Sequence, residues 1–249
     1  MSDVVKGERP VETFLGGRVR VDQPLGGFRS GLDAVMLAAA VPAKPGQAAL
    51  ELGAGSGALS LCLAVRVPHL TVTGVEIDSG LATAANRNAA VNGIHARVSF
   101  FASDIFALPP ELKREFDHVL ANPPFHGDGQ MSPDPARAMA LADSGKLANW
   151  LKLGLQRTVS GGYFTLILRA DRLDEALSAL PQGGVSIYPL WPRAGEPAKR
   201  VILLVRKGSA APIKLLPGLI LHAESGDYTP EADAVLRCGE PLALFGTAL

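Results

Sequence analysis

Short apolar runs alternate along the chain with longer stretches in which apolar residues recur every three to four positions. The apolar runs predict strands over 48–52, 71–76, 96–103, 117–121, 163–169, 185–191 and 200–206. The helical spacing predicts helices over 30–41, 58–66, 79–92, 144–159 and 171–180. Strands that alternate with helices in units of about 25–30 residues are typical of a mainly parallel sheet with helices on both faces. In such a sheet, ligands bind at the carboxyl ends of the strands.

Capping residues mark the ends of two of the predicted helices. Ser30 is placed to cap the first helix, because its hydroxyl can accept from a free backbone N–H group, and Pro42 follows its end. Ser144 is placed in the same way before the helix over 144–159, and the glycines at 161 and 162 are expected to end it.

Composition adds a large core to this picture. Of the 249 residues, 47% are hydrophobic and 19% are charged, which excludes general disorder and allows one large domain or two small ones. The two cysteines, Cys62 and Cys238, are too few for a disulfide framework and are interpreted as buried free thiols. No histidine or cysteine spacing indicates a metal site. No apolar stretch of membrane length and no secretory signal stand out, so the expected location is the cytoplasm.

Charge is balanced over the chain as a whole but not along it. The formal net charge of +0 argues against a protein that coats nucleic acid by bulk charge. Residues 151–207 nevertheless carry nine Lys and Arg against four Asp and Glu, a net +5. Candidates for phosphate contacts in this segment are Arg169, Arg172, Lys199 and Arg200. For any one of them a solvated surface position is the more common role, whereas the group as a whole favours RNA contact.

A glycine-rich loop, ELGAGSG over 51–57, follows the first predicted strand. Glycine lets the backbone turn tightly and approach a ligand closely. Glu76 ends the next strand, where a carboxylate can accept from a ribose diol, and Asp104 follows the third strand, toward an adenine edge. The spacing also fits a dinucleotide fingerprint with Ala58 in third place, so NAD and another nucleoside cofactor both stay open. Glu51 favours the second, because its carboxylate would repel a pyrophosphate but suits an ammonium-bearing ligand.

The stretch Asn122-Pro123-Pro124-Phe125 follows the fourth predicted strand. The two prolines fix φ and remove two N–H donors, so Asn122 sits on a rigid corner. Its amide oxygen and the Pro123 carbonyl can hold a planar –NH2 group and direct the amine lone pair at an electrophile. Phe125 offers a face on which a flipped base can stack. An ordinary proline-rich turn is the alternative, and the glycine loop in the same sheet favours the functional interpretation.

Together, the motifs ELGAGSG, GVEID, ASD and NPPF resemble the class I S-adenosylmethionine-dependent methyltransferases, and NPPF resembles their amino-methylating branch. Four further segments are similar to the bacterial tRNA(Val) adenine amino-methyltransferases: GFRSGLDAVMLAAAV, LRADRLDEAL, WPRAGEPAKRVILLVRKG and IKLLPGLILH. The resemblance covers nearly the whole chain after residue 12. It implies a Rossmann-like α/β fold with a seven-stranded, mainly parallel sheet. One departure is Ala170, where the family is expected to have proline.

The resemblance also implies a domain layout. Residues 46–208 would form the cofactor-binding catalytic domain, residues 1–45 would pack on the cofactor site, and residues 209–249 would be an extension packed on the same domain. The implied substrate is RNA, namely adenine in tRNA near the anticodon. For the oligomeric state, a monomer and a homodimer both stay open.

The implied cofactor is S-adenosyl-L-methionine. The residues implied to bind it are Glu51, Gly53, Ala54, Gly55, Gly57, Glu76, Ile77, Asp104, Ile105 and Asn122, with Arg29 and Asp33 closing the site. For Asp33, a plain charge in the first turn of a helix is an equally favoured role. The implied catalytic residues are Asn122, Pro123, Pro124 and Phe125.

Other functions share parts of this pattern. The stretch NPPFHGDG also resembles the ribosomal RNA guanine amino-methyltransferases, and DNA adenine methylation is a further alternative. The glutamine-amide methyltransferases of release factors likewise use an Asn-Pro-Pro corner. The last group usually carries an extra N-terminal helical domain, for which the roughly 45 residues before the first strand are too few. An NAD-binding oxidoreductase or a nucleotide-binding module would leave the NPPF corner unexplained.

Overall fold

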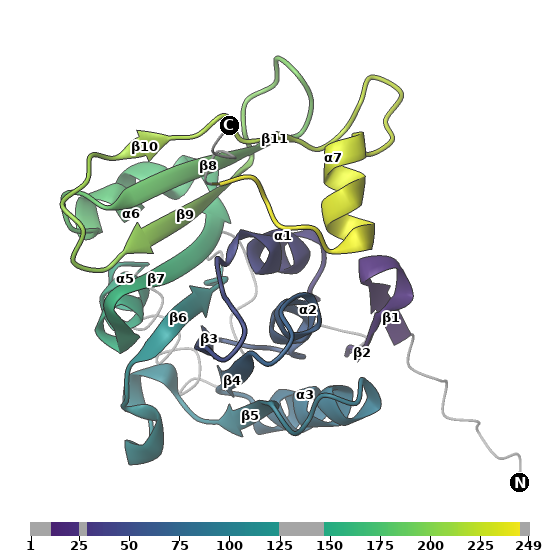
Figure 1. The fold of residues 1–249 in the computed structure, drawn as a ribbon, viewed down its shortest axis with the longest axis vertical. Helices are drawn as coiled ribbons and strands as arrows, with labels where there is room; N and C mark the ends of the chain where they lie inside the picture. The colour runs from purple at the N-terminus through teal and green to yellow at the C-terminus, as the bar shows by residue number, and fades with distance from the viewer. Residues whose placement is uncertain (1–10, 25–28, 125–146, 245–249) are drawn as a thin grey trace, which may run out of the picture.

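The computed structural model describes residues 11–24, 29–124 and 147–244, and its centre is a twisted sheet (Figure 1). The seven longer strands of this sheet are β3 (Ala48–Leu52), β4 (Thr71–Glu76), β5 (Val98–Ala102), β6 (Phe116–Ala121), β7 (Thr158–Arg169), β8 (Val185–Trp191) and β9 (Arg200–Arg206). Two-residue strands, β10 (Lys214–Leu215) and β11 (Leu219–Ile220), extend the sheet beyond β8.

The strand order is β10-β8-β9-β7-β6-β3-β4-β5, with β11 also paired to β8. Neighbours from β7 to β5 pair in parallel, whereas β9 runs antiparallel to both β7 and β8. The predicted class, an α/β fold around a mainly parallel sheet, is confirmed. The chain leaves β3, β4, β6 and β7 at one edge of the sheet and enters β9 at that same edge.

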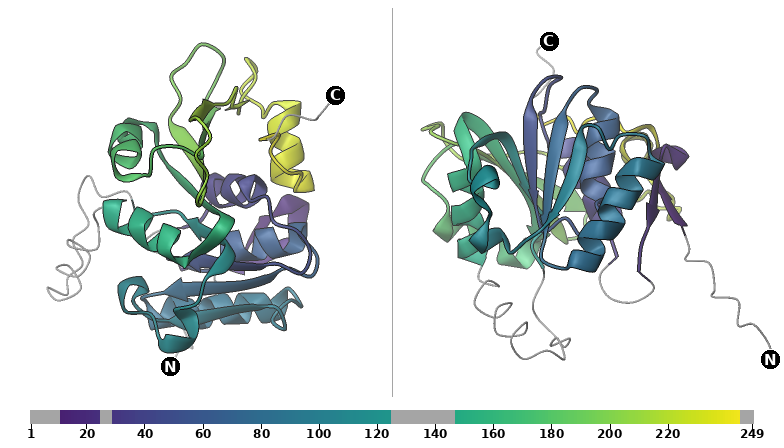
Figure 2. Two further views of the ribbon diagram at one scale, coloured as in Figure 1. Left: turned by 60° about the vertical axis from the view of Figure 1, so that its left-hand side comes forward. Right: turned by 90° about the horizontal axis from the view of Figure 1, so that it is seen from below.

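Helices cover both faces of the sheet (Figure 2). On one face lie α1 (Leu32–Ala40), α2 (Ala58–Arg66) and α3 (Ser79–Val91), and on the other lie α5 (Leu147–Arg157) and α6 (Leu173–Ala179). Alternate residues of one strand feed the two cores, because successive side chains point to opposite faces of a sheet. Leu120 packs with the first group of helices, whereas Val119 and Ala121 pack with the second. The strands therefore read as continuous apolar runs.

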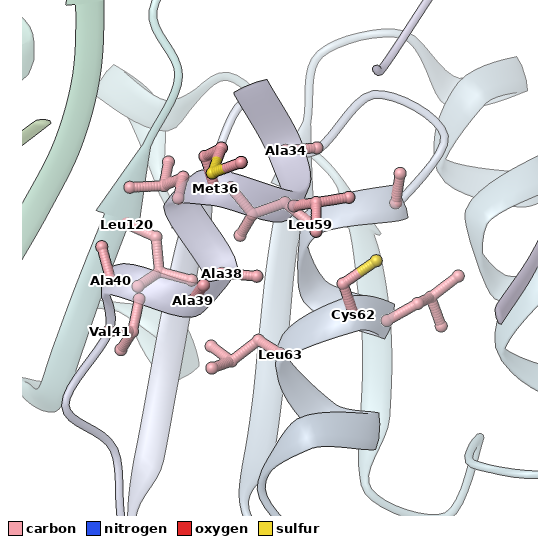
Figure 3. Close-up of a cluster of buried hydrophobic side chains, with 14 of the residues drawn as sticks. Ala34, Met36, Ala38, Ala39, Ala40, Val41, Leu59, Cys62, Leu63 and Leu120 are labelled. Atoms are coloured by element: carbon pink, nitrogen blue, oxygen red, sulfur yellow. The ribbon is translucent and has the colours of Figure 1, made fainter. Parts of the chain in front are cut away.

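The core around α1 and α2 combines small and large apolar side chains, among them Met36 and Leu59 (Figure 3). Ala38, Ala39 and Ala40 are buried on α1. Cys62 lies in this core and is buried, as expected from the sequence. The prediction for Cys238 was wrong, since that cysteine is exposed.

The short strands β10 and β11, which add to the predicted seven-stranded sheet, had no counterpart in the predicted elements, and neither did two further peripheral pieces. One is a hairpin of β1 (Val11–Phe14) and β2 (Val19–Asp22), and the other is α7 (Pro230–Asp233) with the π-helical turn η5 (Ala234–Cys238). The hairpin and α7 lie on the side of the molecule that carries α1 and α3 (Figure 1). The layout into residues 1–45, 46–208 and 209–249 stays a prediction. Over the described ranges, none of the helices has the length and apolar character needed to cross a membrane.

The predicted helix over 144–159 was too long. Helix α5 ends at Arg157, and β7 begins at Thr158, which pairs with Phe116 of β6. The Thr158 hydroxyl donates to the Gly154 carbonyl at 2.7 Å and so satisfies one of the free carbonyls of the last helical turn. The glycines at 161 and 162 therefore lie inside β7, near an irregularity in its register, and do not end the helix. Ser144 lies outside the described residues.

Ser30 was also predicted wrongly as a helix cap. Helix α1 begins after Gly31, which makes no side-chain capping bond. The backbone N–H of Ser30 instead donates to the Gln23 side chain at 2.8 Å, and its carbonyl accepts from the same side chain at 3.0 Å. The segment before α1 is thus held by a tertiary contact, which local capping rules do not anticipate.

Candidate active site

The glycine loop joins β3 to α2 at the carboxyl edge of the sheet. Gly53, Gly55 and Gly57 have φ of 72°, 55° and 86°, the left-handed region that side-chain-bearing residues rarely adopt. The backbone N–H groups of Gly53 and Ala54 both donate to the Val75 carbonyl at 2.9 Å, which ties the loop to β4. A Cβ at Gly55 would meet nothing within 4 Å, so this glycine borders open space.

Glu76 ends β4 directly beside this loop. Its side chain is 8% exposed and accepts from the Gly55 N–H at 2.8 Å and from the Asp78 N–H at 2.9 Å. These two bonds use a different carboxylate oxygen each, so the carboxylate is fixed in orientation. Every carboxylate oxygen can accept a second hydrogen bond, which leaves capacity for ligand hydroxyls.

Glu51 lies deeper, on β3. It is 3% exposed and accepts from the backbone N–H of Ser60 at 3.1 Å and from the Ser60 hydroxyl. Burial raises the pKa of the Glu51 carboxyl to about 8, and the nearby charge of Glu76 adds to the rise. A buried carboxyl of this kind becomes a strong acceptor once a cation is placed next to it.

An apolar rim continues from Glu76 to the end of the neighbouring strand β5. Ile77 is 44% exposed, Ile105 is buried, and Asp104 accepts from the Phe106 N–H at 2.9 Å. Phe106 is 39% exposed and meets Trp150 edge to face, with ring centroids 6.3 Å apart. Phe106 and Trp150 were not predicted from the sequence. Phe106 follows Asp104 closely enough to be found, whereas Trp150 comes to the site only through the packing of α5.

Asn122 and its prolines come next to the glycine loop. Ala121 pairs with Leu52, so Asn122 and Gly53 follow adjacent positions on neighbouring strands. The Asn122 Oδ1 atom is buried, and it has no hydrogen-bond partner in the parts of the chain that the structure describes. A buried acceptor without a partner costs free energy and calls for a functional explanation. Phe125, the predicted stacking residue, lies outside the described residues.

Arg29 and Asp33 do not form a pair. Arg29 forms an ion pair with Glu12 of the N-terminal hairpin. Asp33 accepts from the Arg200 guanidinium at 2.9 Å, which links the first turn of α1 to the start of β9. Asp33 therefore has a structural contact at the edge of the sheet, and the cofactor roles predicted for both residues stay predictions.

The predicted RNA-contacting residues gather where β7 ends and β9 begins. Arg169 pairs across the strands with Arg200 in the β7–β9 register. Three of the four residues have acidic partners: Asp171 for Arg169, Glu175 for Arg172 and Asp33 for Arg200. Within the described ranges, Lys199 makes no ion pair. Asp171 and Glu175 are already counted in the net +5 of the segment, whereas Asp33 comes from outside it and is a partner that sequence counting did not reveal.

Comparison with known proteins identifies relatives of this chain. A family model described as the methyltransferase small domain matches residues 31–149. A tRNA1(Val) (adenine(37)-N6)-methyltransferase of Porphyromonas gingivalis is 31% identical and covers 93% of this chain and 95% of its own length. One from Aeromonas hydrophila is 30% identical, covering 87% and 92%. The chain belongs to the tRNA1(Val) (adenine(37)-N6)-methyltransferase family.

A solved structure agrees with this assignment to a methyltransferase fold. The crystal structure of a predicted O-methyltransferase from Agrobacterium tumefaciens matches with a TM-score of 0.69 and 28% identity, covering 82% of this chain and 94% of that chain. The resemblance drawn from the sequence motifs is confirmed, as is the activity class, S-adenosyl-L-methionine-dependent methyl transfer.

The residues at the strand ends of this methyltransferase fit its cofactor. Gly55 borders open space, and the Glu76 carboxylate beside it can accept from hydroxyl groups. Exposed apolar surface for a nucleobase is present at Ile77 and Phe106. Glu51 offers a buried carboxyl, which suits the ammonium of an amino-acid moiety.

The raised pKa of Glu51 predicts how the stability of the cofactor-free methyltransferase varies with pH. Between the ordinary value of 4.5 and about 8, the folded protein holds a proton that the unfolded chain has released. Stability therefore falls as the pH rises through this window, by up to about 1.4 kcal/mol per pH unit. Glu51→Gln can still accept from Ser60 but does not titrate. We expect its melting temperature, measured by calorimetry without cofactor, to exceed that of the wild type increasingly from pH 5 to pH 8. Parallel pH profiles of the two proteins would contradict this.

Proposed function

We propose that the protein methylates the exocyclic amine of an adenine in tRNA, next to the anticodon. The observation that carries this proposal is the buried Oδ1 atom of Asn122, which has no hydrogen-bond partner among the described residues and lies at the strand edge that holds the glycine loop. An amide oxygen in that position is an acceptor for an –NH2 group. The family supports the base and the RNA, since the relatives are named for adenine 37 of tRNA1(Val).

The proposed cofactor contacts follow from the site's geometry. Glu76 accepts from the ribose hydroxyls, Asp104 and the backbone after it meet the adenine edge, and Ile77 packs against its face. Glu51 lies toward the ammonium of the amino-acid moiety. Gly53, Ala54, Gly55 and Gly57 form the loop beneath, with Ile105 and Asn122 completing the cofactor site. The open space at Gly55 and the free acceptor capacity of Glu76 support this arrangement.

The residues of the chain are proposed to act by holding and orienting the amine. S-adenosyl-L-methionine supplies a methyl group that is already activated on a sulfonium. Asn122 Oδ1 and the Pro123 carbonyl accept the two N–H groups of the amine, which turns its lone pair out of conjugation with the ring. Pro124 stiffens the corner, and Phe125 stacks on the base. No side chain needs to act as a base before transfer, because the methylated amine loses its extra proton readily to water.

Nucleoside analysis tests the proposed substrate. The purified enzyme is incubated with tritiated S-adenosyl-L-methionine and either total tRNA or ribosomal RNA from a strain lacking the modification. The expected product is N6-methyladenosine in the tRNA fraction. Label in ribosomal guanosine, or in a release-factor glutamine when that protein is added, would overturn the proposal in favour of the corresponding rival.

Lys199 is proposed to make a phosphate contact at the edge of the site. The neighbouring Arg169, Arg172 and Arg200 are proposed to contact RNA as well, although each must first break its ion pair with a carboxylate. For Lys199→Ala, the slope of log affinity for tRNA against log salt should fall by about one, because one phosphate contact is lost. Filter binding between 50 and 200 mM salt measures this slope.

Lys214→Ala is the matched control for Lys199. Lys214 is exposed on β10 and pairs with Ser186 at the start of β8. The start of β8 lies away from Arg200, which pairs with Leu190 near the end of that strand. Removal of the Lys214 side chain should leave the slope unchanged. Equal slopes in both variants would exclude the contact at Lys199.

We further propose that the enzyme acts in the cytoplasm, where tRNA is modified, and that residues 1–45 and 209–249 flank a catalytic domain over 46–208.

A further inference from the structure

Two asparagines dock the N-terminal hairpin onto α3. Asn88 Oδ1 accepts from the Asp22 N–H at 2.9 Å, and Asn88 Nδ2 donates to the Asp22 carbonyl at 3.1 Å. Asn92 makes the same pair of bonds with Arg20, at 2.9 and 2.7 Å. Four residues along a helix rise about 6 Å and two residues along a strand about 6.6 Å, so the spacings match. The helix thus presents amides to the free edge of β2 as a neighbouring strand would.

Gln23, directly after β2, is buried and makes four hydrogen bonds. Its side chain is 1% exposed. Its Oε1 atom accepts from the Ser30 N–H at 2.8 Å and from the Ser56 hydroxyl at 3.1 Å. Its Nε2 atom donates to Glu12 at 2.5 Å and to the Ser30 carbonyl at 3.0 Å. Both donors and both acceptor positions of the amide are therefore used.

The side-chain amides of Gln23 and Asn88 both bond to Ser56, a residue of the glycine loop. Ser56 is 4% exposed, and its hydroxyl donates to Gln23 while its carbonyl accepts from Asn88 Nδ2 at 3.0 Å. Ser56 lies between Gly55 and Gly57, which both have positive φ. Glycines give a loop many accessible conformations, so holding it in one costs more entropy than for other residues. The bonds to Ser56 fix the residue between the two glycines before a ligand arrives.

We infer that Gln23 is a positioning residue for cofactor binding, acting through Ser56 to hold the glycine loop in its binding conformation. Gln23 does not touch the cofactor in this inference. Its hydrogen bonds to Glu12 and Ser30 couple the N-terminal hairpin and the segment before α1 to Ser56 of the loop. Preorganisation of this kind increases affinity by removing the ordering cost from the binding step. The inference rests on the proposed function of the glycine loop as the cofactor site.

Gln23→Ala is the first variant of the test, and Asn92→Ala is its matched control. Both remove an amide that docks the same hairpin, but of these two residues, over the described ranges, Gln23 alone also bonds to the glycine loop. Titration calorimetry with S-adenosylhomocysteine should show Kd raised about tenfold in Gln23→Ala and within about twofold of the wild type in Asn92→Ala. At saturating S-adenosyl-L-methionine, kcat should stay within about threefold of the wild type in both. A structural role alone would not separate KM from kcat in this way.

Ser56→Ala keeps the test decisive if Gln23→Ala folds poorly. It deletes only the hydroxyl donor to Gln23, and its Kd should rise about threefold to tenfold. The double variant should bind no more weakly than Gln23→Ala, because both changes remove the same bond. Equal Kd values for Gln23→Ala and Asn92→Ala, or additive effects of Gln23→Ala and Ser56→Ala, would overturn the inference with the proposed function intact. A wild-type enzyme that does not bind S-adenosylhomocysteine would overturn the proposed function, and the inference with it.

Discussion

Asn122→Ala is expected to abolish methyl transfer while cofactor binding persists. The variant removes the amide oxygen that is proposed to orient the amine, and the loss of one such preorganised group costs about 100-fold or more in kcat. The measurement is single-turnover transfer of tritiated methyl to tRNA, with the Kd for S-adenosylhomocysteine determined in parallel. Unchanged turnover would exclude Asn122 from the mechanism.

Stability separates this prediction from trivial misfolding. Because the Oδ1 atom of Asn122 is buried without a partner in the described chain, removing it also removes a desolvation cost of about 1–3 kcal/mol. The melting temperature of Asn122→Ala should therefore equal or exceed that of the wild type. Asn92→Ala, which breaks satisfied hydrogen bonds far from the strand ends, should show the opposite pattern: lower stability with normal turnover. A destabilised and inactive Asn122→Ala protein would leave misfolding as the explanation of its lost activity and contradict the desolvation argument.

The central elements could be predicted because their signals are local. The bounds of β3, β4 and α2 agree with those predicted from apolar runs and from the glycine loop between them. The motifs at the strand ends also came from the sequence, since parallel strands deliver their carboxyl ends to one edge. What the sequence could not show was the ionic environment of the basic segment, because its acidic partners include Asp33, which lies far away along the chain.

The peripheral elements were missed because non-local contacts stabilise them. Strand β2, which pairs with β1, is held by Asn88 of α3 and by Asn92 directly after it, and a helix rich in alanine and asparagine gives no sign of such a role. Gln23 was missed for the same reason, since its partners at Ser30 and Ser56 belong to two other segments. Helix α5 was drawn too long because Thr158 belongs to a strand only by virtue of its pairing with β6.

Glu76→Gln is expected to weaken cofactor binding by about 10–100-fold with little change in kcat at saturating cofactor. The carboxylate accepts from the N–H groups of Gly55 and Asp78, and a glutamine in its place presents an –NH2 group to one of them. The substitution thus loosens the loop and weakens the acceptor for the ribose. The net loss of about one hydrogen bond to a charged group, about 1.5–3 kcal/mol, corresponds to the expected change in affinity. Titration calorimetry with S-adenosylhomocysteine gives the affinity.

Asp117→Asn is the matched control for Glu76→Gln. Asp117 also accepts from a backbone N–H group, that of Ala48 at 2.9 Å, but it lies at the opposite edge of the sheet, where β3 and β6 begin. Loss of a carboxylate bond there should lower the melting temperature without changing the affinity for S-adenosylhomocysteine. If Glu76→Gln bound this ligand as tightly as Asp117→Asn, the proposed contact between Glu76 and the ribose hydroxyls would be excluded. A selective loss in Glu76→Gln would tie cofactor affinity to the end of β4, since the two substitutions change the charge equally and differ in the edge of the sheet at which they act.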